Sequence, residues 1–189
     1  MANWKGIVGL SFTPDQFDTY CHSLRWDAWR PSFIVLHNTA APSLAQRPHG
    51  LTRTHISNLE AYYRDQKGWS AGPHLFVDDR QIWVFTRLTV SGVHSPSWNK
   101  LALGVEMLGD YGREAFDKGR GLKVRRHTVS SIATVCAVTG LDPATLKLHR
   151  EDTLTTHNCP GGNVDKGAVI REVQDLIVER HGGDHGPPA

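Results

Sequence analysis

The sequence predicts an α/β fold in which a mixed central β-sheet is flanked by helices. Short β-prone apolar runs alternate with amphipathic helical patterns, and two neighbouring runs are separated by a polar stretch of hairpin length. Parallel strands need helical crossovers whereas a hairpin pairs antiparallel strands, so the combination indicates a mixed sheet. Neither an internal repeat nor a low-complexity stretch divides the 189 residues, and we expect a single domain over residues 1–182.

The N-terminal part is predicted to form a helix and then a buried strand. Thr13 and Pro14 are typical of an N-cap and a first-turn proline, and the apolar residues after them recur at helical spacing. These features predict a helix over residues 13–25 that packs on the domain. The continuous apolar run 33–36 predicts a buried strand that delivers His37 at its C-terminal end.

The next segments predict a second helix and a hairpin. Residues 52–66 have apolar positions on one helical face, and Gly68 ends that pattern. Two apolar runs, 74–77 and 82–85, flank the polar stretch 78–81, which is typical of a β-hairpin.

The C-terminal half predicts two further strands and two helices. Residues 101–108 read as a strand that carries one carboxylate, Glu106, among apolar neighbours. Thr128 is predicted to cap a helix that Gly140 ends. The remaining elements are a short strand over 146–148 that ends at His149 and a last helix that ends at Gly182.

Composition narrows the class of protein. A net charge of +2 and a pI near 8.5 are too mild for a nucleic-acid footprint, so we expect no nucleic-acid partner. Three widely spaced cysteines argue against a disulfide framework. Neither a signal peptide nor an apolar run of about 18 residues is visible, which predicts a protein made in the cytoplasm without a transmembrane segment. We also expect a monomer. The Gly-, Pro- and His-containing tail, 183–189, is predicted to be disordered.

Three residues form a candidate metal site. His37 and His149 each follow a predicted strand, and Cys159 lies ten residues after His149 in a loop that contains Pro and Gly. Two imidazoles and a thiolate suit Zn²⁺, and three protein ligands leave the fourth tetrahedral position for water, as in catalytic zinc sites. On residue types alone, the alternative to a metal site is that the histidines belong to a capped loop and that Cys159 is an ordinary buried thiol.

Five segments carry a family resemblance by their sequence and their order. They are Phe33–Ala40, Gly72–Asp79, Gly92–Ser95, Asn99–Glu106, and His149–Asp152 with Cys159–Gly161. Together they resemble the type 2 N-acetylmuramoyl-L-alanine amidases, a family that includes T7 lysozyme-like phage endolysins and the peptidoglycan recognition proteins. The resemblance covers most of the chain, from about residue 31 to 180, and implies the amidase fold of that family with one zinc ion per chain.

The resemblance implies roles for five residues. His37, His149 and Cys159 match the zinc ligands, and the thiol favours an enzyme because members that only bind peptidoglycan often lack it. Glu106 matches a carboxylate that exchanges a proton with the attacking water, and apolar neighbours would raise its pKa toward the range of a general base. His157 stands where relatives stabilise the oxyanion. The alternatives are a solvated surface charge for Glu106, and a loop side chain or a replacement ligand for His157.

Substrate contacts are also implied. His94 and His74 match positions near the cleft, and Trp69 and Asn99, with Trp98, are candidates for walls that hold sugar rings or the stem peptide. Hydrogen-bonded structural histidines and ordinary aromatic packing are the alternatives.

Two departures from the family pattern have consequences. The separation of His149 from Cys159 is two residues longer than in the relatives considered, so the loop bulges or the ligand assignment shifts. Pro73 stands where T7 lysozyme-like enzymes have a tyrosine implicated in catalysis, which places more of the proton transfer on Glu106.

The expected activity is zinc-dependent hydrolysis of the lactyl–L-alanine amide of peptidoglycan, by a phage or prophage endolysin that reaches the cell wall after release. Three alternatives remain open. They are a peptidoglycan-recognition module without catalysis, a cytoplasmic amidase that recycles muropeptides, and a cysteine hydrolase that uses Cys159 with His149 or His157. Zinc content and the release of free amines from cell walls distinguish the first, and sensitivity to alkylation rather than to chelators distinguishes the last.

Overall fold

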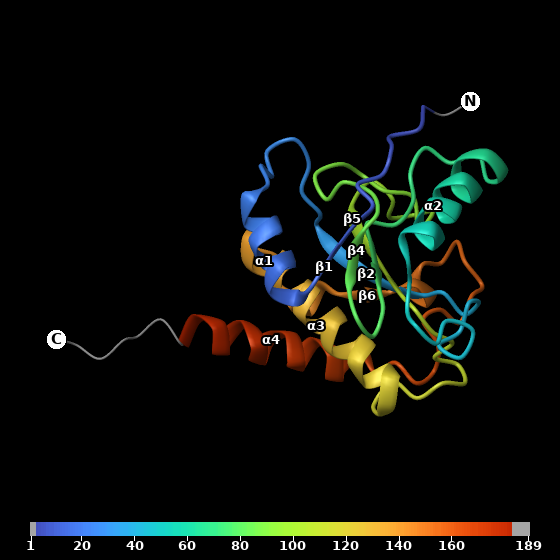
Figure 1. The fold of residues 1–189 in the computed structure, drawn as a ribbon. Coiled ribbons are helices and arrows are strands. Elements are labelled where there is room, and N and C mark those ends of the chain that lie inside the picture. The colour runs from blue at the N-terminus through green and yellow to red at the C-terminus, as the bar shows by residue number, and fades with distance from the viewer. Residues whose placement is uncertain (1–2, 183–189) are drawn as a thin grey trace.

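The computed structural model describes residues 3–182, which form a six-stranded sheet with helices on both sides (Figure 1). The strand order is β1-β4-β3-β5-β2-β6. The predicted mixed sheet is confirmed, because β5 runs parallel to β3 and β2, β2 runs parallel to β6, and β4 is antiparallel to β3 and β1. The predicted disordered tail lies outside the described residues.

Most element bounds follow the sequence pattern, and the exceptions are β1, which the pattern did not predict, and the start of α3. The strands are β1 (Leu10–Phe12), β2 (Phe33–Asn38), β3 (Leu75–Val77), β4 (Ile82–Val84), β5 (Ala102–Met107) and β6 (Lys147–Leu148). The α-helices are α1 (Pro14–Ser23), α2 (Arg53–Ala61), α3 (Gly119–Thr139) and α4 (Lys166–Gly182). A π-helical segment, η1 (Tyr62–Gln66), continues α2, and short 3₁₀ turns occupy η2 (Pro143–Thr145) and η3 (His149–Glu151).

Side-chain caps fix the starts of the first two helices. The Thr13 hydroxyl accepts from the Gln16 N–H, and the Gln16 side chain accepts from the Thr13 N–H, as a capping box does. The predicted N-cap is therefore confirmed, and the helix ends at Ser23. Thr52 caps α2 in the same way, with the His55 ring in place of an acidic or amide partner.

The start of α3 corrects the sequence prediction. The helix begins at Gly119, and Thr128 is a buried residue in its interior rather than its N-cap. The first turns are polar and contain glycine, so they show no apolar period, but a contact between Arg120 and Asp79 ties them to the sheet. Gly140 ends the helix as predicted, in a left-handed conformation with φ of 74°.

Helices α1, α3 and α4 lie on one side of the sheet, and α2 lies on the other (Figure 1). Because successive strand residues face opposite sides, Ile34 of β2 points toward α3, where it shares a small cavity with Ile132, and His37 points away from it. The register pairs His37 with Glu106 of β5. Both polar side chains therefore face the α2 side, while the main core fills the other.

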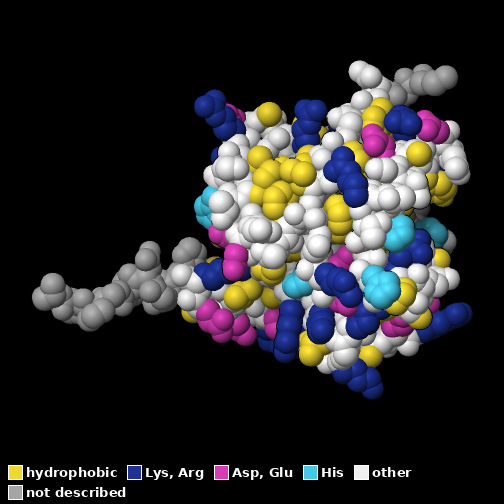
Figure 2. All heavy atoms as spheres, in the orientation of Figure 1, with side chains coloured by type: hydrophobic (Ala, Val, Ile, Leu, Met, Phe, Trp, Pro, Cys, Tyr) yellow, Lys and Arg dark blue, Asp and Glu magenta, His cyan; other side chains and the backbone are white. Residues whose placement is uncertain are grey.

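The surface carries mixed charge. On the face shown in Figure 2, basic side chains lie over the first turns of α3 with acidic side chains among them, in keeping with the mild net charge of +2. Within residues 3–182, the helices are too short or too polar to cross a membrane.

Candidate functional site

The candidate site lies where the parallel strands β2, β5 and β6 end. Their C-terminal ends share one edge of the sheet, and ligand sites in open α/β sheets form at such edges. His37 lies near the end of β2, Glu106 lies near the end of β5, and His149 directly follows β6. All three side chains line a cleft of about 480 Å³, together with Cys159.

His37, His149 and Cys159 offer ligand atoms that all lie within 4.8 Å of one another. The His37 ring is 3% exposed, and Nε2 of His149 is buried without a hydrogen-bond partner among the described residues. A buried polar atom without a partner costs free energy, which a bound cation at this nitrogen would offset. Two imidazoles and a sulfur fit Zn²⁺ by donor type, so the group is a suitable zinc site.

The long loop between His149 and Cys159 bulges outward. The Arg150 N–H donates to the Cys159 carbonyl at 2.7 Å and closes the loop at its base, while Leu154 at its tip is 71% exposed. The bulge accommodates the two extra residues, and it is Cys159, not His157, whose ligand atom is grouped with those of His37 and His149.

Asp152 fixes this loop from inside and was missed by the sequence analysis. Its carboxylate accepts hydrogen bonds from the hydroxyls of Ser95 and Ser97, both at 2.5 Å. Burial alone raises the pKa of Asp152, but the serine hydrogen bonds outweigh it and bring the pKa to about 2. Asn99, predicted to contact substrate, instead accepts from the backbone N–H groups of His94 and Ser95 and holds that neighbouring segment.

Glu106 has the electrostatics of a proton-transfer group. Burial alone raises its pKa to about 8, because no residue within 3–182 donates a hydrogen bond to its carboxyl group. Val105 and Met107 face the opposite side of the sheet, so the desolvation comes from the cleft walls and not, as the sequence suggested, from these neighbours. The same carboxyl group also lines an adjoining cavity of about 340 Å³ beside α2.

Three aromatic or imidazole side chains form the outer parts of the cleft. Trp69 lines it as predicted, stacked on Tyr63 with ring centroids 4.9 Å apart. Tyr63 was missed, and the only signal for it was its place near the end of an amphipathic helix. Burial and the nearby Glu106 raise the pKa of Tyr63. His157 is exposed and lines the cleft next to His149, with ring centroids 5.9 Å apart.

The two other predicted histidines differ in their surroundings. His94 lines the cleft and is 8% exposed, and its Nδ1 lies 3.0 Å from Nε2 of His37. His74 is fully buried and is not among the cleft residues. Its ring is hydrogen-bonded to the carbonyl of Val90 and the N–H of Gly104. His74 thus has the surroundings of the structural histidine that the sequence left as an alternative.

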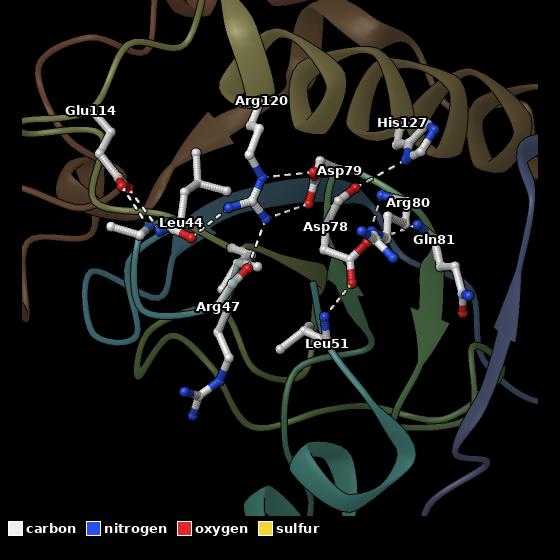
Figure 3. Close-up of polar contacts among 12 residues, drawn as sticks. Leu44, Arg47, Leu51, Asp78, Asp79, Arg80, Gln81, Glu114, Arg120 and His127 are labelled. Atoms are coloured by element: carbon white, nitrogen blue, oxygen red, sulfur yellow. Dashed lines mark hydrogen bonds and ion pairs between the residues drawn. The ribbon is translucent and has the colours of Figure 1, made fainter. Parts of the chain in front are cut away.

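One wall of the cleft comes from the loop after β2, which a polar cluster anchors (Figure 3). The Arg120 guanidinium binds the Asp79 carboxylate through two hydrogen bonds of 2.8 Å and donates to the carbonyls of Leu44 and Arg47. Asp78 accepts from the Leu51 N–H at 2.6 Å. The wall is therefore tied to both α3 and the hairpin.

Comparisons with known proteins agree with this architecture. Peptidoglycan-recognition protein SC2 of Drosophila melanogaster is 24% identical over 135 residues, which are 70% of each chain. Among solved structures, the endolysin amidase LysCS from Clostridium intestinale URNW has a TM-score of 0.61 at 19% identity, covering 80% of this chain and 92% of that one. The Ph2119 endolysin from a Thermus scotoductus MAT2119 bacteriophage has a TM-score of 0.56 at 25% identity, covering 79% and 88%.

The family model described as N-acetylmuramoyl-L-alanine amidase matches residues 27–162, a span that contains the ligand triad, Glu106 and His157. With most of the chain matched and the fold shared, the resemblance inferred from the ordered motifs is confirmed, and the chain belongs to the N-acetylmuramoyl-L-alanine amidase family.

Proposed function

We propose that the protein is a zinc-dependent amidase that hydrolyses the amide bond between the lactyl group of muramic acid and L-alanine in peptidoglycan. The main support is that ligand atoms of His37, His149 and Cys159 lie within 4.8 Å of one another, in a cleft that Glu106 also lines. Family membership supports the choice of bond.

Zinc held by these three side chains supplies Lewis acidity, which lowers the pKa of water and polarises a carbonyl oxygen. The Glu106 carboxylate accepts the proton of the attacking water. The resulting carboxylic acid then gives this proton to the departing amine of L-alanine, and the raised pKa of Glu106 suits both steps near neutral pH. His157 donates an N–H hydrogen bond to the oxygen that becomes negative during attack. Trp69 and Tyr63 form an aromatic wall for the substrate.

A cysteine hydrolase is the weaker alternative. Burial and the nearby Glu106 raise the pKa of the Cys159 thiol to about 12, whereas nucleophilic cysteines have a lowered pKa. The Asn38 N–H donates to its sulfur, a contact that equally suits a thiolate ligand.

We further propose that the amidase is an endolysin, made in the cytoplasm and active on the cell wall after release. Similarity to two endolysins of solved structure supports this role. Lysis of outer-membrane-permeabilised cells by the purified protein tests it, and cleavage of soluble muropeptides without lysis would favour a recycling amidase instead.

The decisive experiment measures bound zinc and the release of N-terminal alanine from purified peptidoglycan. Cys159→Ser is expected to lose both zinc and activity because a hydroxyl is a poor ligand for Zn²⁺. Cys136→Ser, which removes a buried thiol of α3, is the matched control and should keep both. A wild-type protein that binds wall fragments but releases no alanine with zinc present would instead be a recognition module.

Glu106→Gln separates metal binding from catalysis. The amide cannot take a proton, so we expect full zinc content and a fall in kcat of about 10²- to 10⁴-fold. A variant that keeps wild-type kcat would remove Glu106 from the mechanism.

A further inference from the structure

A chain of hydrogen bonds leads from the backbone of β5 to the ring of His37. Nε2 of His94 lies 3.0 Å from the carbonyl oxygen of Ala102, the first residue of β5. Nδ1 of His94 lies 3.0 Å from Nε2 of His37. Both ring nitrogens of His94 are therefore engaged, one by the backbone and one by a ligand of the proposed zinc site.

The direction of this chain follows from its first member. A carbonyl oxygen can only accept, so Nε2 of His94 carries the hydrogen, and Nδ1 of the neutral ring is left as an acceptor. Nε2 of His37 must then be the donor to it. This places the proton of His37 on Nε2 and leaves its Nδ1 with a free lone pair, for which no partner exists among residues 3–182.

The His94 ring is held firmly enough to impose this direction. Asn99 accepts from the His94 backbone N–H at 2.6 Å. Gly104 lies against the ring, because a Cβ at that position would come within 2.5 Å of the His94 Cγ. The two rings meet nearly at right angles, with an interplanar angle of 88° and centroids 5.1 Å apart, and His94 Nδ1 is the atom hydrogen-bonded to the His37 ring.

We propose that His94 is a positioning residue for the metal: it keeps the proton of His37 on Nε2 and presents Nδ1 as the ligand atom. The proposal rests on the zinc site proposed above. It replaces the substrate contact expected for His94, because both ring nitrogens are already used within the protein. Groups that hold a ligand histidine in this way contribute to metal affinity as well as to its orientation.

The test compares zinc affinity in wild type, His94→Leu and His94→Asn by competition with a chelator. Leucine removes the acceptor, and we expect zinc affinity about 10- to 100-fold weaker. The Oδ1 of asparagine can take the place of Nδ1, so His94→Asn should recover most of the affinity. His127→Leu is the control: it removes a half-buried imidazole of α3 that is hydrogen-bonded to the Asp78 carbonyl and contacts neither His37 nor His94, and it should bind zinc like wild type.

A second readout needs no zinc and no activity. In the metal-free wild type, ¹⁵N NMR of the His37 ring is expected to show a single form with the proton on Nε2. A wild-type His37 with its proton on Nδ1 would overturn the proposal even if the leucine variant fails to fold. Unchanged zinc affinity in a folded His94→Leu variant would also overturn the positioning role. The proposed function would still stand in that case, provided that the wild type binds zinc and releases alanine. Failure of the wild type to bind zinc would contradict both the positioning role of His94 and the proposed function.

Discussion

At the scale of single residues, Glu106 costs the fold stability and supplies a group suited to proton transfer. Its backbone belongs to the central strand β5, and its side chain lines the cleft. Burial there raises its pKa to about 8, and no described residue donates a hydrogen bond to its carboxyl group. A protein that needed only stability would place an apolar residue here. The unfavourable environment of the ionised form is the property that a proton-transfer group requires.

This environment makes the stability of the metal-free protein depend on pH. The folded pKa of Glu106 lies above the ordinary value of 4.5, so its protonated form stabilises the fold at low pH, and this contribution is lost as pH rises toward 8. We expect metal-free Glu106→Gln to melt at a higher temperature than wild type at pH 8, by roughly 2–4 °C per kcal/mol relieved, and at the same temperature at pH 4. Thermal unfolding with a chelator present measures this.

Glu179→Gln, which neutralises an exposed carboxylate of α4, is the control and should leave the difference between the two pH values unchanged. Equal melting temperatures of wild type and Glu106→Gln at pH 8 would mean that the carboxyl group is better solvated than its surroundings indicate.

At the scale of elements, the cleft depends on loops that are tied down from outside it. Arg120 of α3 donates hydrogen bonds to the carbonyls of Leu44 and Arg47 (Figure 3). Asp152 holds the loop before Cys159 through its hydrogen bond from Ser95. The Arg120 contacts lie away from the ligand triad. Their loss should therefore change substrate binding before it changes metal binding.

Arg120→Lys tests this separation. The single ammonium group of lysine cannot bind the Asp79 carboxylate and both carbonyls at the same time. The loop after β2 should therefore exchange its amide hydrogens faster. We expect a KM raised several-fold with unchanged zinc content, measured by hydrogen exchange, steady-state kinetics and metal analysis. Lys123→Arg, in the same helix, is the control. Loss of zinc from Arg120→Lys would show that the wall and the metal site are not separable.

At the scale of the whole molecule, strands β2 to β6 were predictable because their apolar runs are followed by turn residues, whereas the three residues of β1 are too few to show a pattern. The sequence thus located His37, Glu106 and His149 at strand ends. The sequence did not predict the first turns of α3, because their glycines and charged residues leave no apolar helical periodicity. It also did not identify Asp152 and Tyr63 as residues of the site. Their contacts join segments far apart in the chain, and local pattern carries no information about such pairs.

Zinc should stabilise the folded molecule as a whole, because its ligands come together only in the native state. At a zinc concentration 100-fold above Kd, mass action contributes about 2.7 kcal/mol. We expect the Tm of wild type to rise by roughly 5–10 °C on adding zinc, and that of Cys159→Ser to stay where it was. Calorimetry measures both, and an equal rise in the two proteins would indicate zinc binding elsewhere.

The position of β6 has a consequence for the making of the protein. This strand lies at the edge of the sheet beside β2, although it is the last strand in the chain, and Cys159 follows it. As a chain is synthesised from its N-terminus, His37 is present long before its two partners. A ribosome-bound chain that stops short of Cys159 therefore holds most of the fold but only part of the triad, and the full set of ligands arrives only when translation of the domain is nearly finished.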